Sequence, residues 1–333
     1  MREICRARLA AAGFNVAEQE FEYSTFPGRW ATPIGGVIAC LTVVSAAALG
    51  VHGRAGPAMT VIAIAAVALV IAGRMIARRV TTLPWARASS VNLVATRGMP
   101  RVWLVAHLDS KSQPVAMLAR VAGIVLTAAT LITLGALALT AMGGEVVPAR
   151  AWHLLAVIGA VASLPVIASV VTARSPGALD NGSGIVTVLL AAEALPREMS
   201  LGVLLTSAEE LGMAGAHAFA ESRRPAMAIN VDGVDDRGST ICMYQGRAAR
   251  VRVGVARAAR AIGMRVREQP TIPGLLTDGV ALGEAGWSAV TLSRGGLATL
   301  WRVHRAADTA DRLSGVGMHE VARLVASAAR EIA

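Results

Sequence analysis

The sequence predicts an α/β fold in which helices cover both faces of a mixed sheet in three layers, with two hairpins of membrane-spanning helices inserted into it. Two observations support this prediction. Short apolar runs that resemble strands alternate with helical stretches in the second half of the chain. The whole chain of 333 residues is also 54% hydrophobic, with a mean hydropathy of +0.55, which is too apolar for an ordinary soluble domain.

Four stretches of the chain contain no Asp, Glu, Lys or Arg. They are residues 30–53, 55–73, 121–144 and 151–173. Each reaches about the 20 residues that a helix needs to cross about 30 Å of hydrocarbon. The four stretches form two pairs with a short loop inside each pair, so each predicted hairpin leaves and returns on the same side. They contain almost no ionisable groups, which indicates an anchor and gives no sign of a transport path.

The net charge of +10 comes almost entirely from arginine, because Lys111 is the only lysine. Arginines gather before the first apolar stretch and after the second, while the loops inside the hairpins carry few charges. The positive-inside rule therefore predicts a multi-pass protein of the cell membrane with its globular part in the cytoplasm. The arginines do not gather on one face with aromatic side chains, so nucleic-acid binding is not expected.

The predicted globular part is assembled from three segments. Residues 1–30 supply a helix and a strand, residues 88–112 supply strands that carry the first metal ligand, and residues 174–333 form the remainder. The hairpins occupy residues 31–79 and 114–173 between them. Strands are expected at 14–23, 91–95, 101–106, 201–206, 226–231 and 288–292, and helices at 184–194, 213–221, 248–262 and 315–332. A fold tolerates such insertions in surface loops whose ends lie close together.

Acidic and imidazole side chains lie at the ends of these predicted strands or in the loops between them. They are His107, Asp109, Asp180, Glu209, Glu210, Asp232, His304 and Asp308. Several buried carboxylates must be protonated, paired with arginine or bound to metal, because burying an unpaired charge is costly. The two histidines favour metal. Imidazole combined with carboxylate suits zinc, and cobalt or manganese fit the same donors.

The order of the motifs AHLDS, LDNGSG, EELG and NVDG, followed by a histidine with an aspartate four residues later, resembles metallopeptidase family 28. This is the family of co-catalytic zinc aminopeptidases that includes bacterial leucyl aminopeptidase and aminopeptidase Y. The resemblance covers about residues 14–25, 91–112 and 175–333, and none of the apolar stretches. It implies a zinc-exopeptidase-like fold, two zinc ions and the removal of N-terminal residues from peptides.

The resemblance also implies a role for each ligand. Asp180 would bridge the two zinc ions. The terminal ligands would be His107 and Asp232 for one ion, and Glu210 and His304 for the other.

Three further carboxylates are expected to assist these ligands. The resemblance makes Glu209 the general base, which takes a proton from the attacking water and passes it to the leaving amine. Asp109 lies two residues after His107, and Asp308 lies four residues after His304. Both are expected to orient the imidazole that precedes them. Asp235 and Asp236 are interpreted as a solvated loop without a role.

Other interpretations stay open. Adjacent glutamates are also typical of a solvated helix start, and the residues after Asp180 are typical of a turn. A related zinc hydrolase or acyltransferase, such as a carboxypeptidase, a deacylase or a glutaminyl cyclase, would use the same ligands. A non-enzymatic membrane scaffold would be expected to have lost ligands. The chain also departs from the family where Arg305 and Ala306 replace Thr-Pro, and where Gly279 replaces a frequent histidine after Asp278.

The expected partners are a peptide substrate and the lipid bilayer. The sequence does not define the residue that is removed or the oligomeric state.

Overall fold

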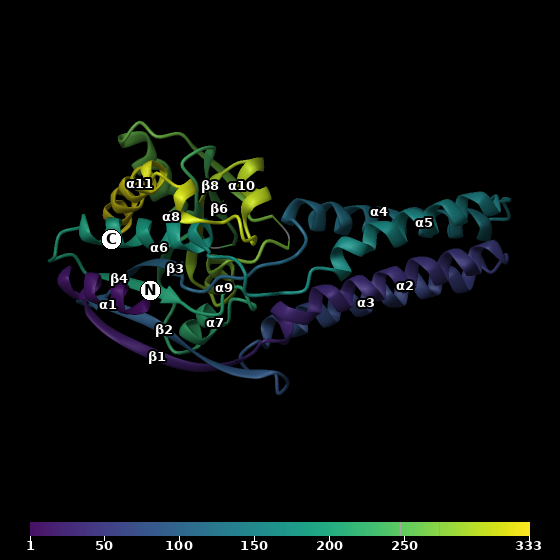
Figure 1. Ribbon diagram of the computed structural model, residues 1–333, viewed down its shortest axis with the longest axis horizontal. Helices are drawn as coiled ribbons and strands as arrows, with labels where there is room; N and C mark the ends of the chain where they lie inside the picture. The colour runs from purple at the N-terminus through teal and green to yellow at the C-terminus, as the bar shows by residue number, and fades with distance from the viewer. Residues whose placement is uncertain (247, 273) are drawn as a thin grey trace. The chain divides into compact units, whose positions relative to one another are not determined.

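The computed structural model describes residues 1–246, 248–272 and 274–333, without the side chains of residues 77 and 78. The chain divides into two compact units (Figure 1). We call the first the sheet unit, which comprises Met1–Thr25, Val80–Ser112 and Ala173–Ala333. We call the second the helical unit, which comprises Phe26–Arg79 and Gln113–Thr172. Each unit is described separately below.

The sheet unit contains a mixed sheet, as the sequence predicted, and this sheet has eight strands. The strands are β1 (Asn15–Ser24), β2 (Arg87–Arg97), β3 (Val102–His107), β4 (Leu201–Thr206), β5 (Met227–Val234), β6 (Ser239–Tyr244), β7 (Val266–Pro270) and β8 (Ser288–Gly295). Their order across the sheet is β1-β2-β4-β3-β5-β8-β6-β7. The central strands β4, β3, β5 and β8 run parallel, whereas the pairs β1–β2, β2–β4 and β6–β8 are antiparallel. The sequence did not predict β6 and β7.

Helices cover both faces of this sheet (Figure 1). One face packs against α1 (Arg2–Ala11), α6 (Gly184–Glu193), α8 (Ala249–Ala261) and α11 (Val316–Ile332), and the other packs against α7 (Ala214–Glu221) and α9 (Asp278–Glu284). The short elements are η2 (Ala178–Ser183), α10 (Leu297–Arg302) and η3 (Ala310–Arg312).

Alternation along β3 shows how one strand fills two cores. Its residues are all buried, and Leu104 joins the core beneath α6 and α11, while Trp103 joins the core beneath α7 and α9. In this second core the ring of Trp103 lies edge-on to Phe219 and Trp287, with centroid distances of 4.9 and 6.3 Å. Each fully buried large apolar side chain contributes roughly 1.5–3 kcal/mol to folding, so the sheet is a rigid support for the loops at its edge.

The helical unit consists of η1 (Pro27–Ala31), α2 (Thr32–Val51), α3 (Ala55–Arg78), α4 (Met117–Met142) and α5 (Ala149–Ile167). Four of its helical segments are long and apolar enough to cross a membrane. Small residues allow the helices to pack closely, because a Cβ at Gly50 would lie 2.4 Å from the ring of Trp152. Large apolar side chains such as Leu41 and Ile132 point outward, 61% and 73% exposed, which suits a lipid environment better than water.

The topology of the sheet brings the predicted site residues to one edge. His107 is the last residue of β3 and pairs with Thr206, the last residue of the parallel strand β4. Glu209 and Glu210 follow β4, and Asp232 lies in the parallel strand β5. The carboxyl ends of parallel strands meet at the same edge, which is where open α/β sheets build their sites.

Candidate metal centre

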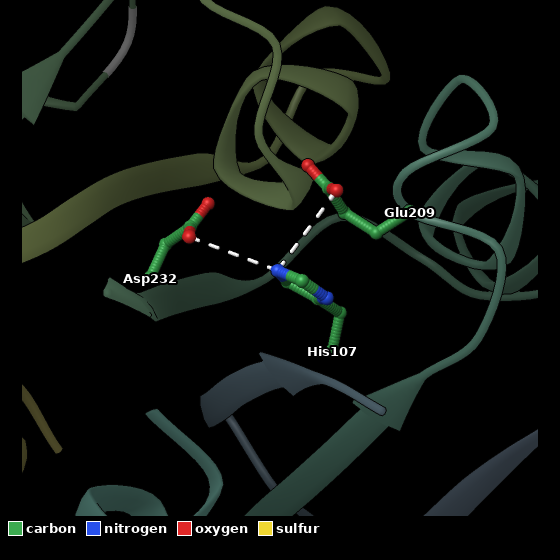
Figure 2. Close-up of side chains that lie close together, drawn as sticks. All are labelled: His107, Glu209 and Asp232. Atoms are coloured by element: carbon green, nitrogen blue, oxygen red, sulfur yellow. Dashed lines mark ion pairs between the residues drawn. The ribbon is translucent and has the colours of Figure 1, made fainter. Parts of the chain in front are cut away.

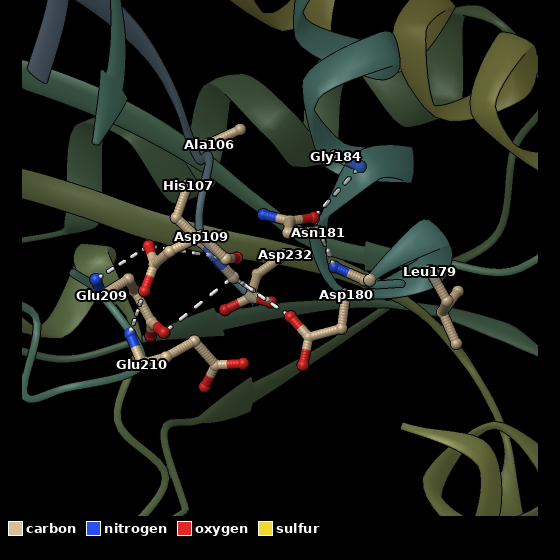
Figure 3. Close-up of polar contacts among 12 residues, drawn as sticks. Ala106, His107, Asp109, Leu179, Asp180, Asn181, Gly184, Glu209, Glu210 and Asp232 are labelled. Atoms are coloured by element: carbon tan, nitrogen blue, oxygen red, sulfur yellow. Dashed lines mark hydrogen bonds and ion pairs between the residues drawn. The ribbon is translucent and has the colours of Figure 1, made fainter. Parts of the chain in front are cut away.

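Asp180 lies between two imidazoles that are distant in the sequence. One of its carboxylate oxygens is 3.1 Å from His107 Nε2, and the other is 2.9 Å from His304 Nε2. Figure 3 shows the contact between His107 and Asp180. A carboxylate that presents a different oxygen to each of two imidazoles has the arrangement that a bridging metal ligand needs.

Two groups of donor atoms surround Asp180. His107, Glu209 and Asp232 form the first group (Figure 2), in which His107 Nε2 is 3.9 Å from Glu209 Oε2 and 3.7 Å from Asp232 Oδ1. The second group consists of Asp180, Glu210 and His304, and Glu210 Oε1 is 3.3 Å from His304 Nε2. Within each group the donor atoms lie within 4.8 Å of one another. The predicted ligands therefore converge, and the geometry places Glu209 in the first group together with His107 and Asp232.

Asp109 holds the loop that carries the two glutamates. Its carboxylate oxygens accept hydrogen bonds from the backbone N–H groups of Glu209 (3.0 Å) and Glu210 (3.1 Å) (Figure 3). The expectation that this carboxylate orients His107 is corrected by these contacts. His107 Nδ1 instead faces the backbone carbonyl oxygen of Asp109 at 3.0 Å, while the nearest carboxylate oxygen is 3.8 Å away.

Asp308 holds the loop that carries Asp180. Its two carboxylate oxygens accept hydrogen bonds from the backbone N–H groups of Leu179 (2.7 Å) and Asp180 (3.1 Å). The expectation that Asp308 orients His304 is wrong, and His304 Nδ1 has no hydrogen-bond partner among the described residues. A spacing of four residues brings side chains together only on a helix. His304 has φ +62°, a left-handed conformation that does not continue a helix.

The side chain of Asn181 fastens the same loop to β5. Its Nδ2 group donates to the carbonyl oxygen of Val231 at 2.9 Å, and its Oδ1 accepts from the backbone N–H groups of Gly184 and Gly233 at 3.0 and 3.1 Å. These contacts reach the residues on both sides of Asp232. The asparagine of the DNGSG motif therefore fixes the spacing between two predicted ligands, Asp180 and Asp232.

Asp235 and Asp236 are structural and not a solvated loop, which corrects the interpretation from the sequence. Asp235 is 8% exposed, and its Oδ2 lies 2.7 Å from Thr299 Oγ1 and 3.0 Å from Arg302 Nη2 on α10. The carboxylate of Asp236 accepts backbone N–H groups of Ser314 and Gly317. Both anchors lie in segments that flank His304, so they help to position that imidazole.

The sequence matches the model of Peptidase family M28 over residues 160–329, which is half of the chain. The chain belongs to Peptidase family M28. Membership in this family implies zinc and supports a zinc hydrolase. A sequence search of curated proteins gives no match.

Solved structures resemble this M28 chain in fold. The zinc aminopeptidase BSAP of Bacillus subtilis is 18% identical with a TM-score of 0.47, over 73% of this chain and 51% of its own. Glutaminyl cyclases of Fimbriiglobus ruber and Macrostomum lignano are 14% and 12% identical, each with a TM-score of 0.54 over 99% of this chain and 86% and 81% of theirs. The M28 chain therefore spans about half the length of the first aminopeptidases that it matches.

Lys111 is a site residue of this M28 chain that the sequence interpretation missed. Its ammonium group lies 2.5 Å from Glu210 Oε2, and its side chain is only 17% exposed. Burial alone would raise the pKa of Glu210, but the nearby Lys111 charge brings that pKa below its usual value. The available signal was the position of the only lysine four residues after His107, in the sequence HLDSK.

Asp278 is a second residue that the interpretation passed over. It is fully buried and forms no ion pair among the described residues. Its carboxylate accepts a hydrogen bond from the hydroxyl of Thr206 at the end of β4. Burial raises its pKa to about 7. The glycine that follows it is explained by packing, because a Cβ at Gly279 would lie 2.3 Å from Thr291 Oγ1. A histidine at this position would therefore require the side chain of Thr291 to shift.

The electrostatics of the centre fit the cations that the family implies. Burial raises the pKa of Glu209 well above its usual value, and the neighbouring carboxylates raise it further. Burial would lower the pKa of His107, but the carboxylates of Glu209, Asp180 and Asp232 raise it well above its usual value. Without a bound cation, the carboxylates and the imidazole therefore hold protons more tightly, because protons are the positive charge that is available to them. Glu210 Oε1 is buried without a hydrogen bond among the described residues, and its nearest donor is His304 Nε2 at 3.3 Å. A buried oxygen without a hydrogen bond, beside an imidazole, suits a metal ligand.

Proposed function

We propose that this protein is a membrane-anchored di-zinc aminopeptidase. The observation that supports this most directly is the carboxylate of Asp180, which faces the imidazoles of both donor groups with separate oxygens. Asp180, His107 and Asp232 would hold one ion, and Asp180, Glu210 and His304 the other. Membership in a peptidase family supports a hydrolytic reaction, and the substrate would be a peptide with a free N-terminus.

Zinc bound to these residues would lower the pKa of a shared water toward neutrality and stabilise the oxyanion of the attacked peptide carbonyl. The protein itself supplies the proton transfer. Glu209 would accept the proton of the attacking water and return it to the leaving amine. Burial and the neighbouring carboxylates raise the pKa of its carboxyl group, which favours holding a proton between the two steps. Asp109 fixes the backbone of Glu209, so the carboxylate stays in place through both transfers.

A substrate panel tests the proposal. We expect the purified full chain, loaded with zinc, to release chromogenic amines from aminoacyl derivatives with a free α-amine and to leave their N-acetylated forms intact. Three further substrates test the alternatives. N-blocked peptides with a free C-terminus test for a carboxypeptidase, N-acyl amino acids for a deacylase, and peptides with N-terminal glutamine for a glutaminyl cyclase. Cyclisation of the glutamine peptide without aminoacyl hydrolysis would replace the aminopeptidase with a glutaminyl cyclase. Activity on none of these, with zinc near zero, would leave only the scaffold.

We further propose that the helical unit anchors the protein with its sheet unit in the cytoplasm. The length and composition of the four helical segments support the anchor, and the arginines that flank the two hairpins support the orientation. A reporter fused after Ala333 that is active only in the cytoplasm is the expected result. A reporter active only on the outer side would reverse the orientation, and recovery of the full chain from the soluble fraction would contradict the anchor.

A further inference from the structure

A cavity of about 290 Å³ lies at the amino ends of the parallel strands, whereas the metal centre lies at their carboxyl ends. It is lined by Arg8, Ala11, Ala12, Arg97, Glu193 and Arg197. Arg97, the last residue of β2, pairs with Leu201 at the start of β4, whereas His107 pairs with Thr206 at the end of β4. The extended strand between these two positions spans roughly 17 Å. The cavity is therefore separate from the metal centre.

Two positive charges in this cavity have no ion pair. Arg8 and Glu193 neutralise each other through two parallel hydrogen bonds, both of 2.8 Å. Arg197 donates to the backbone carbonyl oxygen of Ala11 at 2.9 Å, which is a neutral acceptor. Among the described residues neither Arg97 nor Arg197 forms a salt bridge. Burial and the like charge of Arg197 lower the pKa of Arg97, while Glu198 opposes this shift.

The guanidinium of Arg97 leaves its best anion-binding edge unused. Arg97 is only 5% exposed, and its Nε and Nη2 groups are buried without a hydrogen-bond partner among the described residues. Its Nη1 group donates to the carbonyl oxygens of Ala12 and Leu195 at 3.3 and 3.5 Å. Phe14 covers the flat face of the group, 4.3 Å from Cζ to the ring centroid, and leaves the N–H groups at its edge unpaired.

The two unpaired groups are the ones that bind oxyanions. Nε and Nη2 form a fork that matches two oxygens of one carboxylate or phosphate. Arg8 uses the same two nitrogens on Glu193. Buried donors are rarely left unpaired, because their loss of water is not compensated.

We propose that this cavity binds a phosphate group, with Arg197 on one of its oxygens and the fork of Arg97 on two others, for which the buried guanidinium must turn toward the cavity. Phosphate is favoured over a single carboxylate because a phosphate monoester carries a charge of about −1.5 to −2 near pH 7, which balances both arginines. The cavity is at the small end of ligand pockets, so it suits free phosphate or a headgroup with a terminal phosphate. The bound group would link Arg97 at the end of β2 to Arg197 in the loop that follows α6.

Titration with inorganic phosphate tests this site. The full chain is purified in detergent, loaded with zinc and kept in phosphate-free buffer. We expect saturable binding of one phosphate per chain by calorimetry and a rise in Tm of a few degrees, because a ligand that binds only the folded state stabilises it. Arg197→Gln should weaken binding at least 10-fold. Arg97→Lys, which keeps the charge and removes the fork, should also weaken it, and the exposed Arg237→Gln serves as the matched control.

Zinc content equal to that of the wild type verifies that each variant is folded. Absence of saturable phosphate binding to the wild type, in detergent and in membranes, would overturn the proposal. Equal affinities of Arg197→Gln and Arg237→Gln would also overturn it. Nanodiscs with phosphatidic acid, compared with phosphatidylcholine alone, identify the source of the group. A rise in Tm that depends on Arg197 and on phosphatidic acid assigns the site to a lipid headgroup, and one with inorganic phosphate assigns it to a soluble phosphate.

Discussion

Glu209→Gln is expected to lower kcat by about 10²- to 10⁴-fold, the usual contribution of a general base, while the zinc content per chain stays unchanged. The amide keeps the size of the side chain and its place after β4, but it does not accept a proton at neutral pH. The backbone N–H of Glu209 still donates to Asp109, so the loop keeps its position. The loss should therefore fall on kcat, with little change in KM.

The measurement combines initial rates on aminoacyl substrates with zinc analysis of the same preparations. Glu331→Gln is the matched control, because Glu331 is exposed in the last turn of α11. Equal rates in wild type and Glu209→Gln would disprove the general-base role. Loss of activity together with one zinc ion would instead make Glu209 a ligand of the group that it shares with His107 and Asp232.

The fold was predictable where strands are buried on both faces. β3 and β4 are buried along their whole length, so each appears in the sequence as a continuous apolar run between turns. β7 has the opposite character: it lies at the edge of the sheet, it is largely exposed, and its sequence is VREQP. Edge strands of this kind carry charged residues and proline. Such residues are also typical of loops, so the sequence did not indicate a strand here.

The site was predictable as a set of residues but not as a set of contacts. The order of the motifs placed His107, Asp180 and His304 at one centre, and their imidazoles and carboxylate meet there. The partners of Asp109 and Asp308 are backbone N–H groups of other loops. Such partners depend on how each loop turns, and sequence spacing does not encode that.

Lys111 illustrates the same limit. Its position four residues after His107 is visible in the sequence. Its partner Glu210 is brought to it by the parallel pairing of β3 and β4, together with the loop that Asp109 holds. The sequence analysis therefore did not assign this lysine to the centre, and only the fold shows that it neutralises a ligand.

Lys111→Met is expected to destabilise the metal-free protein by about 3–5 kcal/mol, the usual effect of removing one partner of a buried ion pair. The variant leaves Glu210 buried beside Asp180 and without the ammonium group that lies 2.5 Å away in the wild type. Zinc should then bind more tightly for two reasons. No fixed positive charge repels it, and its charge relieves a stronger repulsion among the ligand carboxylates. The lower stability of the metal-free variant and its tighter zinc binding both increase the stabilisation that zinc gives to Lys111→Met.

Thermal unfolding with and without a zinc chelator measures this difference. The drop in Tm on chelation should be larger in Lys111→Met than in the wild type by about 10 °C, and competition with a chelating dye should show the tighter binding. Lys111→Arg keeps the charge next to Glu210 and serves as the control, with a drop close to that of the wild type. An equal drop in Lys111→Met would mean that the ammonium group does not act as a counter-charge to the ligands. Weaker zinc binding in that variant would mean instead that Lys111 acts mainly by holding Glu210 in position, with its Oε1 directed toward His304.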